Sequence, residues 1–347
     1  MERSEIYRSS EVAKVLPDRI TIYTRYHEKS GKGRNEEGIE ALQRVQEERK
    51  KRMDKARNTR YSGRLSAGAR KRLRVALERL LWISPVKSFA HPIDGHNVNF
   101  RLTFLTVTLP AAQGRVTDHD IYSTSFKPFL EKLRRSYGVK NYVWRAERQK
   151  NGNLHYHIVT NQFLWRTKVQ RDWNNYIARI GFVDRFREKH GHSNPPSTNI
   201  DKVAEMGELT CYMRKYMSKG ADEEQVIYSK LWDCSKPLKA KIINELAISA
   251  DVNDELQDVM CSGDADVLYA DHFFLLVSRS RKISEWYGEK LSKQLNEYLD
   301  AIKNWREPEK KKESKKLGNC PKDLTNGEKY VQGKLSFALE WAQRTTV

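Results

Sequence analysis

The chain has 347 residues, enough to form more than one domain around a sizeable buried core. Lysine and arginine outnumber aspartate and glutamate by 64 to 45, and the resulting net charge of +19 favours a polyanionic partner such as nucleic acid. The four cysteines lack metal-ligand spacing and no long apolar run is present, which argues against a disulfide scaffold, a cysteine zinc site and a membrane span, and favours the cytoplasm.

Residues 1–97 are predicted to form a basic, largely helical N-terminal region. Within it, residues 20–24 could form a short strand, and residues 35–58 are dense in charge with a helical pattern. A helix is also predicted over residues 66–82, where leucines in helical spacing follow the basic run Arg70, Lys71 and Arg72. Such a helix could grip the DNA backbone or could be an ordinary solvated surface helix, and the charge pattern leaves both interpretations open.

Residues 98–240 are taken as one domain, because strands and helices alternate there. Strands are predicted over residues 100–109, 140–149 and 154–161, and helices over residues 118–137 and 168–180, followed by a loop region with glycine and proline through residue 196. The expected fold class is α+β, with a central antiparallel sheet and helices on one face.

Residues 241–347 are predicted to form a helical C-terminal region, preceded by a helical pattern over residues 238–250. A short apolar run at residues 273–277 fits a buried strand or helix, and an amphipathic helix follows over residues 284–305. Residues 308–316 form a charged linker before a last helical segment.

The first group of candidate functional residues lies in a predicted hairpin. His155 and His157 are two residues apart, so both imidazoles point to the same face of one strand. A three-residue loop, Lys150-Asn151-Gly152, places Glu147 opposite His155 on that face and leaves an apolar set on the other. A two-residue Asn-Gly turn would move Glu147 to the wrong face, so we expect the longer loop.

Glu147, His155 and His157 therefore form a candidate metal site. Two imidazoles and one carboxylate supply nitrogen and oxygen ligands and leave positions open for water and a phosphate oxygen. This ligand set suits Mn²⁺ or Mg²⁺ better than structural zinc. Standing alone, a His-x-His pair on a half-buried strand would more often be structural.

The second group lies in residues 199–220, predicted to form a helix that a glycine ends. Tyr212 and Tyr216 share one helical face, and each is followed three residues later by a lysine, Lys215 or Lys219. A nearby lysine favours phenolate and neutralises the charge of a phosphate under attack. The structural alternative is a helix whose two tyrosines only pack on the sheet.

Together these motifs resemble those of the HUH endonuclease superfamily, in the branch of rolling-circle replication initiators, or Rep proteins. Three motifs occur in the family's order: the threonine-containing strand Phe104–Pro110, the His-Tyr-His strand with Glu147 upstream, and the tyrosine helix. Leu231–Leu238 is similar to a segment that follows the tyrosine helix in phage and plasmid initiators. The resemblance covers residues 98–240 and implies a ferredoxin-like or RRM-like nuclease core.

The resemblance implies a site-specific nickase and strand transferase. Tyr216 or Tyr212 would attack a phosphodiester of single-stranded origin DNA, leaving a 5′-phosphotyrosyl enzyme and a free 3′-hydroxyl. Mg²⁺ or Mn²⁺ at the candidate metal site would orient the scissile phosphate. Tyr216 is slightly favoured as a sole nucleophile because Lys219 completes the family's tyrosine-x-x-lysine ending, yet Tyr212 has the same relation to Lys215.

The implied partners are single-stranded origin DNA, a DNA polymerase and a host or separate helicase, in the cytoplasm of the host cell and away from membranes. A separate helicase is expected because no G-x-x-x-x-G-K-S/T motor sequence occurs. The oligomeric state is left open. Besides the basic run of the N-terminal helix, the candidate DNA contacts are Thr106, Thr108, Arg145 and Lys150.

Two other functions compete with this one. An HUH transposase or mobilisation nickase would use the same chemistry, although mobilisation relaxases usually carry their nucleophile near the N-terminus. A non-catalytic protein could bind a single strand on the sheet and use the tyrosines only for stacking. Such a binding protein would tolerate EDTA and the replacement of both tyrosines by phenylalanine, whereas a nickase would lose its covalent adduct.

Overall fold

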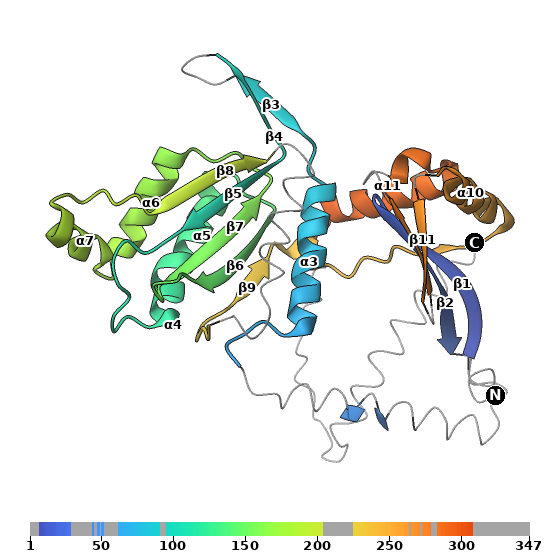
Figure 1. The fold of residues 1–347 in the computed structure, drawn as a ribbon, viewed down its shortest axis with the longest axis horizontal. Coiled ribbons are helices and arrows are strands. Elements are labelled where there is room, and N and C mark those ends of the chain that lie inside the picture. Colours follow the sequence, from blue (N-terminus) through green and yellow to red (C-terminus); the bar gives the residue numbers. More distant parts are fainter. Residues whose placement is uncertain are drawn as a thin grey trace, which may run out of the picture. The chain divides into compact units, whose positions relative to one another are not determined.

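The computed structural model describes residues 7–28, 44, 47–48, 50–51, 62–90, 95–203, 225–263, 265–270, 273–278 and 283–307. They contain two five-stranded sheets and one two-stranded hairpin, all antiparallel, together with helices (Figure 1). The predicted α+β class is confirmed. Among the described helices, none is long and apolar enough to cross a membrane.

The core sheet, which carries the candidate metal site, has the strand order β8-β5-β7-β6-β9. In that order its strands are Thr198–Val203, Leu102–Val107, Leu154–Thr160, Tyr142–Arg148 and Trp232–Cys234. Strands β5, β6 and β7 confirm the three strands predicted for this domain. The short edge strand β9 comes from the segment that the resemblance singled out after the tyrosines.

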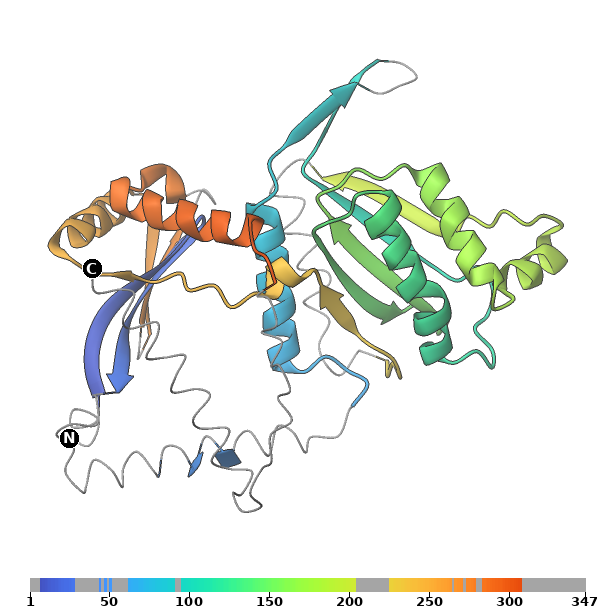
Figure 2. The ribbon, with the colours of Figure 1, turned by 180° about the vertical axis from the view of Figure 1, so that it is seen from behind.

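One face of the core sheet packs on helices. Helix α4 (Asp118–Asp120), the π-helical turn η1 (Ile121–Phe126) and α5 (Lys127–Ser136) follow one another without a break, and α6 (Arg166–Ala178) lies beside them (Figure 2). The aromatic ring of Phe126 stacks on Tyr156 of β7, with the ring centroids 3.7 Å apart. The apolar residues predicted for this face, among them Trp144, Tyr156 and Ile158, are buried there.

The opposite face is covered at one end, which corrects the expectation of helices on one face only. Helix α3 (Ala67–Trp82) begins at the Ser66 cap and buries Leu73, Leu77 and Leu80. These leucines belong to a cluster with four residues of the core sheet: Leu102, Phe104, Val143 and Val159. The helix is amphipathic, as predicted, and its apolar stripe finds its partner in this sheet end.

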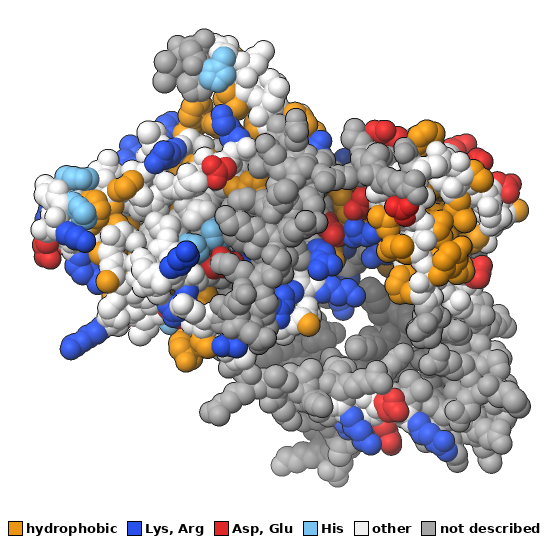
Figure 3. Space-filling view, viewed as in Figure 1, with side chains coloured by type: hydrophobic (Ala, Val, Ile, Leu, Met, Phe, Trp, Pro, Cys, Tyr) orange, Lys and Arg blue, Asp and Glu red, His pale blue; other side chains and the backbone are white. Residues whose placement is uncertain are grey.

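The second sheet has the order β10-β1-β2-β12-β11. Its strands in that order are Leu246–Ala247, Tyr7–Leu16, Arg19–Glu28, Phe273–Ser278 and Ala265–Ala270. Helices α10 (Ala250–Cys261) and α11 (Glu289–Lys303), with the 3-10 turn η2 (Ile283–Trp286), pack on one face. Figure 3 shows hydrophobic side chains gathered over these strands, where Leu268, Tyr269, Phe273 and Phe274 are exposed.

This second sheet corrects the prediction of largely helical N-terminal and C-terminal regions. The expected short strand at residues 20–24 is part of the ten-residue β2, which pairs with β1 on one side and β12 on the other. The predicted helix over residues 238–250 is also wrong. Only α9 (Lys236–Lys239) is helical before Ala250, because Leu246 pairs with Ala13 of β1 and Asn244 donates to the Val15 carbonyl.

Two further expectations for the domain at 98–240 need correction. Residues 182–190, within the expected loop, form helix α7 (Phe182–His190), which buries Phe182, Val183 and Phe186 and ends at Gly191 with a positive φ of 75°. The start of the predicted tyrosine helix is instead β8, an edge strand that pairs with β5. Outside the sheets, β3 (Lys87–Ala90) and β4 (Asn97–Phe100) form a hairpin that projects from the core sheet (Figure 1).

Several predicted segments lie wholly or largely outside the described residues. They are the region 35–58, of which Arg44, Glu47, Glu48, Lys50 and Lys51 are described as helical, the tyrosine segment after Val203, and the linker and last helix after residue 307. The domain boundaries near residues 98 and 240 stay predictions.

Candidate metal centre

The hairpin β6–β7 has the register predicted from the sequence. Glu147 pairs with His155, and Arg145 pairs with His157 one step along the ladder. Gln149 donates to the Asn153 carbonyl, which leaves a three-residue loop of Lys150, Asn151 and Gly152. Gly152 has a φ of +83°, the left-handed conformation that favours glycine, and this loop sets the register that brings the ligands together.

The three candidate ligands converge on one point. Oε2 of Glu147 lies 3.7 Å from Nε2 of His155 and 3.5 Å from Nε2 of His157, and the two Nε2 atoms lie 3.1 Å apart. Such close ring nitrogens compete for one hydrogen unless a cation lies between them. Among the residues that the structure describes, these three form a group that could hold a metal ion, with all ligand atoms within 4.8 Å of one another.

Thr106 of β5 fixes the orientation of one ligand. Its Oγ1 lies 3.0 Å from Nδ1 of His157 and its backbone pairs with that histidine across the β5–β7 ladder. When the threonine hydroxyl accepts the Nδ1 hydrogen, Nε2 presents its lone pair to the metal site, as outer-shell partners of metal-binding histidines do. Thr106 was predicted as a DNA contact, and its position gives it a role in holding His157.

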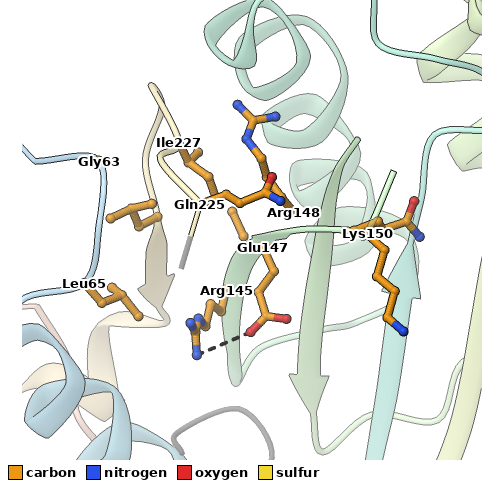
Figure 4. A pocket seen from close by; sticks show the side chains of 11 residues that line it. Gly63, Leu65, Arg145, Glu147, Arg148, Lys150, Gln225 and Ile227 are labelled. Carbon is orange, nitrogen blue, oxygen red and sulfur yellow. Dashed lines mark ion pairs between the residues drawn. The ribbon is translucent and has the colours of Figure 1, made fainter. Parts of the chain in front are cut away.

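Arg145 lies beside the ligands on the same face of β6. Its Nη1 is 3.4 Å from Oε1 of Glu147, and the two side chains are only 7% and 8% exposed. Figure 4 shows this ion pair in a cavity that is also lined by Lys150, Gln225 and Ile227. Arg145 therefore shares with Glu147 both a charge contact and the wall of the same cavity.

Burial and charge set the protonation states of the ligands. Burial lowers the pKa of His157 to about 4, and the attraction of Glu147 only partly opposes this. Burial acts to raise the pKa of Glu147, but the polar contacts with His155 and His157 and the charge of Arg145 outweigh it and hold the pKa below its ordinary value. At neutral pH His157 is therefore neutral and Glu147 ionised, which are the forms that bind a metal ion.

Tyr156 stands between the two histidines in sequence but belongs to the opposite face. It is buried in the apolar cluster under α5, where Phe126 stacks on its ring. Burial raises its pKa well above the ordinary value for a phenol. Tyr156 is therefore an anchor for the ligand-bearing strand and is unsuited to act as a nucleophile.

A buried ion pair, which the sequence analysis missed, ties the segment after residue 225 to the core sheet. Nη2 of Arg148 lies 2.6 Å from Oδ2 of Asp118, which also accepts the Tyr228 amide at 2.8 Å. The Arg148 Nε donates to the Val226 carbonyl. Because the two charged residues are thirty positions apart, no local sequence signal could have paired them.

The candidate catalytic residues Tyr212, Lys215, Tyr216 and Lys219 lie outside the described residues. The chain is described again from Gln225, nine residues after Tyr216, and Gln225 lines the cavity beside Glu147. The described chain thus resumes next to the candidate metal site.

The other predicted DNA contacts occupy different places. Thr108 donates to the Ser197 carbonyl at 3.2 Å, and Lys150 is exposed in the hairpin loop. In α3, Lys71 and Arg72 are exposed and Arg70 is half-buried. The role of these residues in DNA binding stays a prediction.

Comparison with known proteins adds one finding. Residues 102–221 match the family model of the replication-associated protein ORF2. The matched stretch contains Thr106 and the three candidate ligands, and it also includes Tyr212 and Tyr216. The match supports a replication-associated protein of the Rep type. No curated protein and no solved structure matches the chain.

Proposed function

We propose that this protein is a replication initiator that nicks single-stranded origin DNA by metal-dependent tyrosine transesterification and later rejoins the ends. The observation that carries the proposal is the convergence of Glu147, His155 and His157 within a segment that matches a replication-associated family. The HUH resemblance of the same motifs gives this group its proposed role. Rolling-circle replication is the process that uses such a nick.

The proposed metal is Mn²⁺ or Mg²⁺, held by Glu147 Oε2 and the Nε2 atoms of His155 and His157. Two imidazoles and one carboxylate leave coordination positions for water and a phosphate oxygen, and the set lacks the thiolates of structural zinc sites. A divalent ion bound there would neutralise charge on the non-bridging oxygens of the scissile phosphate. Thr106 would keep His157 in the orientation that this requires.

The proposed reaction conserves the phosphodiester bond. The phenolic oxygen of Tyr216 or Tyr212 forms a bond to phosphorus while the bond from phosphorus to the 3′-oxygen breaks. The phenol loses its proton, and the departing 3′-oxygen gains one and becomes a free hydroxyl for a polymerase. The 5′ end stays linked to tyrosine, so the reverse reaction with a 3′-hydroxyl rejoins the strand. Lys219 and Lys215 are proposed to favour the phenolate.

The number of active tyrosines decides how replication would end. With two nucleophiles, the second tyrosine cleaves the regenerated origin while the first holds the 5′ end. With one, a second subunit or a water molecule is required. In either case the proposed partners are origin DNA, a polymerase and a separate helicase, in keeping with the lack of a Walker sequence.

Metal dependence of the covalent adduct tests this proposal. The protein is incubated with Mn²⁺ and 5′- or 3′-labelled single strands from its own replicon, and denaturing gels are examined for protein bound to the 5′-phosphate end. We expect an adduct that EDTA abolishes, that Mn²⁺ restores and that the paired substitution His155→Ala and His157→Ala removes. The matched control is His190→Ala with His192→Ala, which removes two exposed histidines of the same spacing and should retain the adduct.

Two other results would favour the alternative functions. Tight binding of the strand with no adduct on any origin-containing oligonucleotide, and no effect of EDTA on binding, would favour a non-catalytic single-strand-binding protein. An adduct that forms on transposon-end or transfer-origin strands but not on a replication origin would favour an HUH transposase or mobilisation nickase.

A further inference from the structure

Arg145 forms an ion pair with a candidate metal ligand. It precedes Glu147 by two residues on β6, so the two side chains point to the same face. Across the ladder its partner is His157, the second ligand. Its guanidinium lies 3.4 Å from Glu147 and the side chain is 7% exposed, so the charge is held in place away from bulk water.

The charges of these groups nearly cancel before a metal binds. Glu147 contributes one negative charge, Arg145 contributes one positive charge that no ordinary pH removes, and His157 is neutral. A divalent cation at the ligands would therefore meet a carboxylate that is already paired and a guanidinium of the same sign. In a site with little water this repulsion is weakly screened.

A phosphate group would reverse this balance. Arginine binds phosphate through two parallel N–H donors, and a divalent cation binds the non-bridging oxygens of the same group. Arg145 and Glu147 line one cavity, together with Lys150 at its rim, so an anion there would lie between the guanidinium and the metal position (Figure 4). Each positive group would then stabilise the anion that relieves its repulsion with the other.

We infer that Arg145 makes this a composite site in which a divalent metal and a phosphate of the DNA backbone bind cooperatively, each weakly without the other. Arg145 moves its ion pair from Glu147 to the phosphate when the metal takes the carboxylate. The inference rests on the proposed function, since it names how the nicking site recognises its substrate. It gives Arg145 two tasks: it suppresses metal binding in the free protein, and it contacts the phosphate in the complex.

Coupling of this kind is reciprocal, which makes it measurable without cleavage. The factor by which DNA raises the affinity for metal equals the factor by which metal raises the affinity for DNA. For two fixed charges at this spacing we expect a factor on the order of tenfold, inside the usual range of roughly 5- to 150-fold for coupled sites. Tyr212→Phe with Tyr216→Phe can serve as the background, so that no covalent adduct disturbs the equilibrium.

The experiment measures Mn²⁺ binding from the electron paramagnetic resonance signal of the free ion. Titrations are made without DNA, with a single-stranded phosphodiester oligonucleotide, and with a methylphosphonate oligonucleotide of the same sequence, whose backbone has no charge. We expect the phosphodiester strand to raise Mn²⁺ affinity on the order of tenfold, and the uncharged strand to leave it unchanged.

Variants assign the effect to Arg145. Arg145→Gln should raise the Mn²⁺ affinity of the free protein and remove most of the gain that DNA provides, whereas Arg145→Lys, which keeps the charge, should retain much of it. The matched control is Arg135→Gln, which removes one arginine charge from an 83% exposed side chain on α5 and should behave like the parent protein.

Mn²⁺ affinity that the phosphodiester strand leaves unchanged overturns the inference, as does weaker Mn²⁺ binding by free Arg145→Gln than by the parent protein. The latter result would leave Arg145 with only a supporting role for Glu147. If circular dichroism shows that the glutamine variant does not fold, the comparison of charged and uncharged strands in the parent protein decides alone. Cooperative binding without an adduct from the tyrosine-containing protein would keep this inference and reject the nicking reaction.

Discussion

Glu147 and His155 face each other across the β6–β7 ladder, with Oε2 of the carboxylate 3.7 Å from Nε2 of the imidazole. The contact exists because the hairpin loop contains three residues. A register one residue away would turn one member of the pair into the apolar cluster under α5. The loop is thus a determinant of the candidate metal site, although none of its residues is a ligand.

The first prediction concerns this loop. Gly152→Ala should lower the free energy of unfolding by about 1–2 kcal/mol, because alanine is strained at a φ of +83°. An added Cβ would meet nothing within 4 Å, so the cost is purely conformational. Urea unfolding followed by circular dichroism measures it.

The control for Gly152→Ala is Gly68→Ala in helix α3, where the added Cβ meets only the tip of the Arg72 side chain. That variant should be more stable than the parent by about 0.5–1 kcal/mol, because glycine is unfavourable within a helix. Equal effects of the two substitutions would contradict the conformational explanation.

The second prediction isolates the contact between Thr106 and His157. Thr106→Val keeps the branched shape and removes the hydroxyl 3.0 Å from Nδ1, so Mn²⁺ affinity should fall about 10- to 100-fold. Thr108→Val is the matched control, since it removes a hydrogen bond to the Ser197 carbonyl and touches no ligand. Both variants lose one hydrogen bond, so a similar loss of Mn²⁺ affinity in both would argue against the positioning role.

The third prediction is a loss of stability in acid. The pKa of His157 is about 4 in the folded protein against 6.5 for an ordinary histidine, so between these values the unfolded chain binds more protons. The stabilising contribution is fully present above about pH 6.5 and is lost as pH falls toward 4, by at most about 1.4 kcal/mol per pH unit. Urea unfolding of the metal-free protein across this range measures the slope.

His157→Gln should flatten this slope, since the group that titrates is gone. His192→Gln, which removes an exposed histidine outside the site, should leave the slope in place. A slope that is identical in His157→Gln and the parent protein would show that other groups dominate the acid response.

The fourth prediction concerns the buried pair behind the sheet. Asp118→Asn should lower the free energy of unfolding by about 3 kcal/mol, because Arg148 keeps its charge in a largely buried position without its partner. Mn²⁺ affinity should be retained, since the pair lies on the face opposite the ligands. The control Asp300→Asn breaks an exposed pair with Lys303 and should cost less than about 1 kcal/mol.

The sequence predicted those parts of the fold that local signals determine. The register of β6 and β7 follows from the loop glycine and from the alternation of polar and apolar residues, and α3 follows from its Ser66 cap and leucine spacing. The ligand set was predictable for the same reason, since all three ligands lie in one hairpin.

Features that depend on distant partners were not predictable in this way. Strand β2 pairs with β12 through residues such as Tyr23 and Phe273, which are far apart in the chain, so neither strand by itself indicates the sheet that completes it. The contact of Thr106 with His157 and the pairing of Asp118 with Arg148 likewise join separate elements.

Two errors arose where a local signal was present and was outweighed. The apolar spacing of Phe182, Val183 and Phe186 is helical, but the surrounding glycines and prolines favoured a loop. Thr198 and Ile200 alternate inward as a strand requires, yet the helical pattern around the tyrosines was extended back over them.

The central claim is that a tyrosine of this chain becomes covalently linked to DNA. The most direct measurement is the mass of the labelled tryptic peptide from the Mn²⁺-dependent adduct, in the parent protein and in Tyr212→Phe, Tyr216→Phe and the double variant. We predict a 5′-phosphotyrosyl peptide that contains Tyr216 or Tyr212 and is lost in the double variant. Loss in one single variant would identify a sole nucleophile, and adducts in both single variants would identify two. An adduct that persists in the double variant, or none in the parent protein on its own origin strand, would contradict the claim.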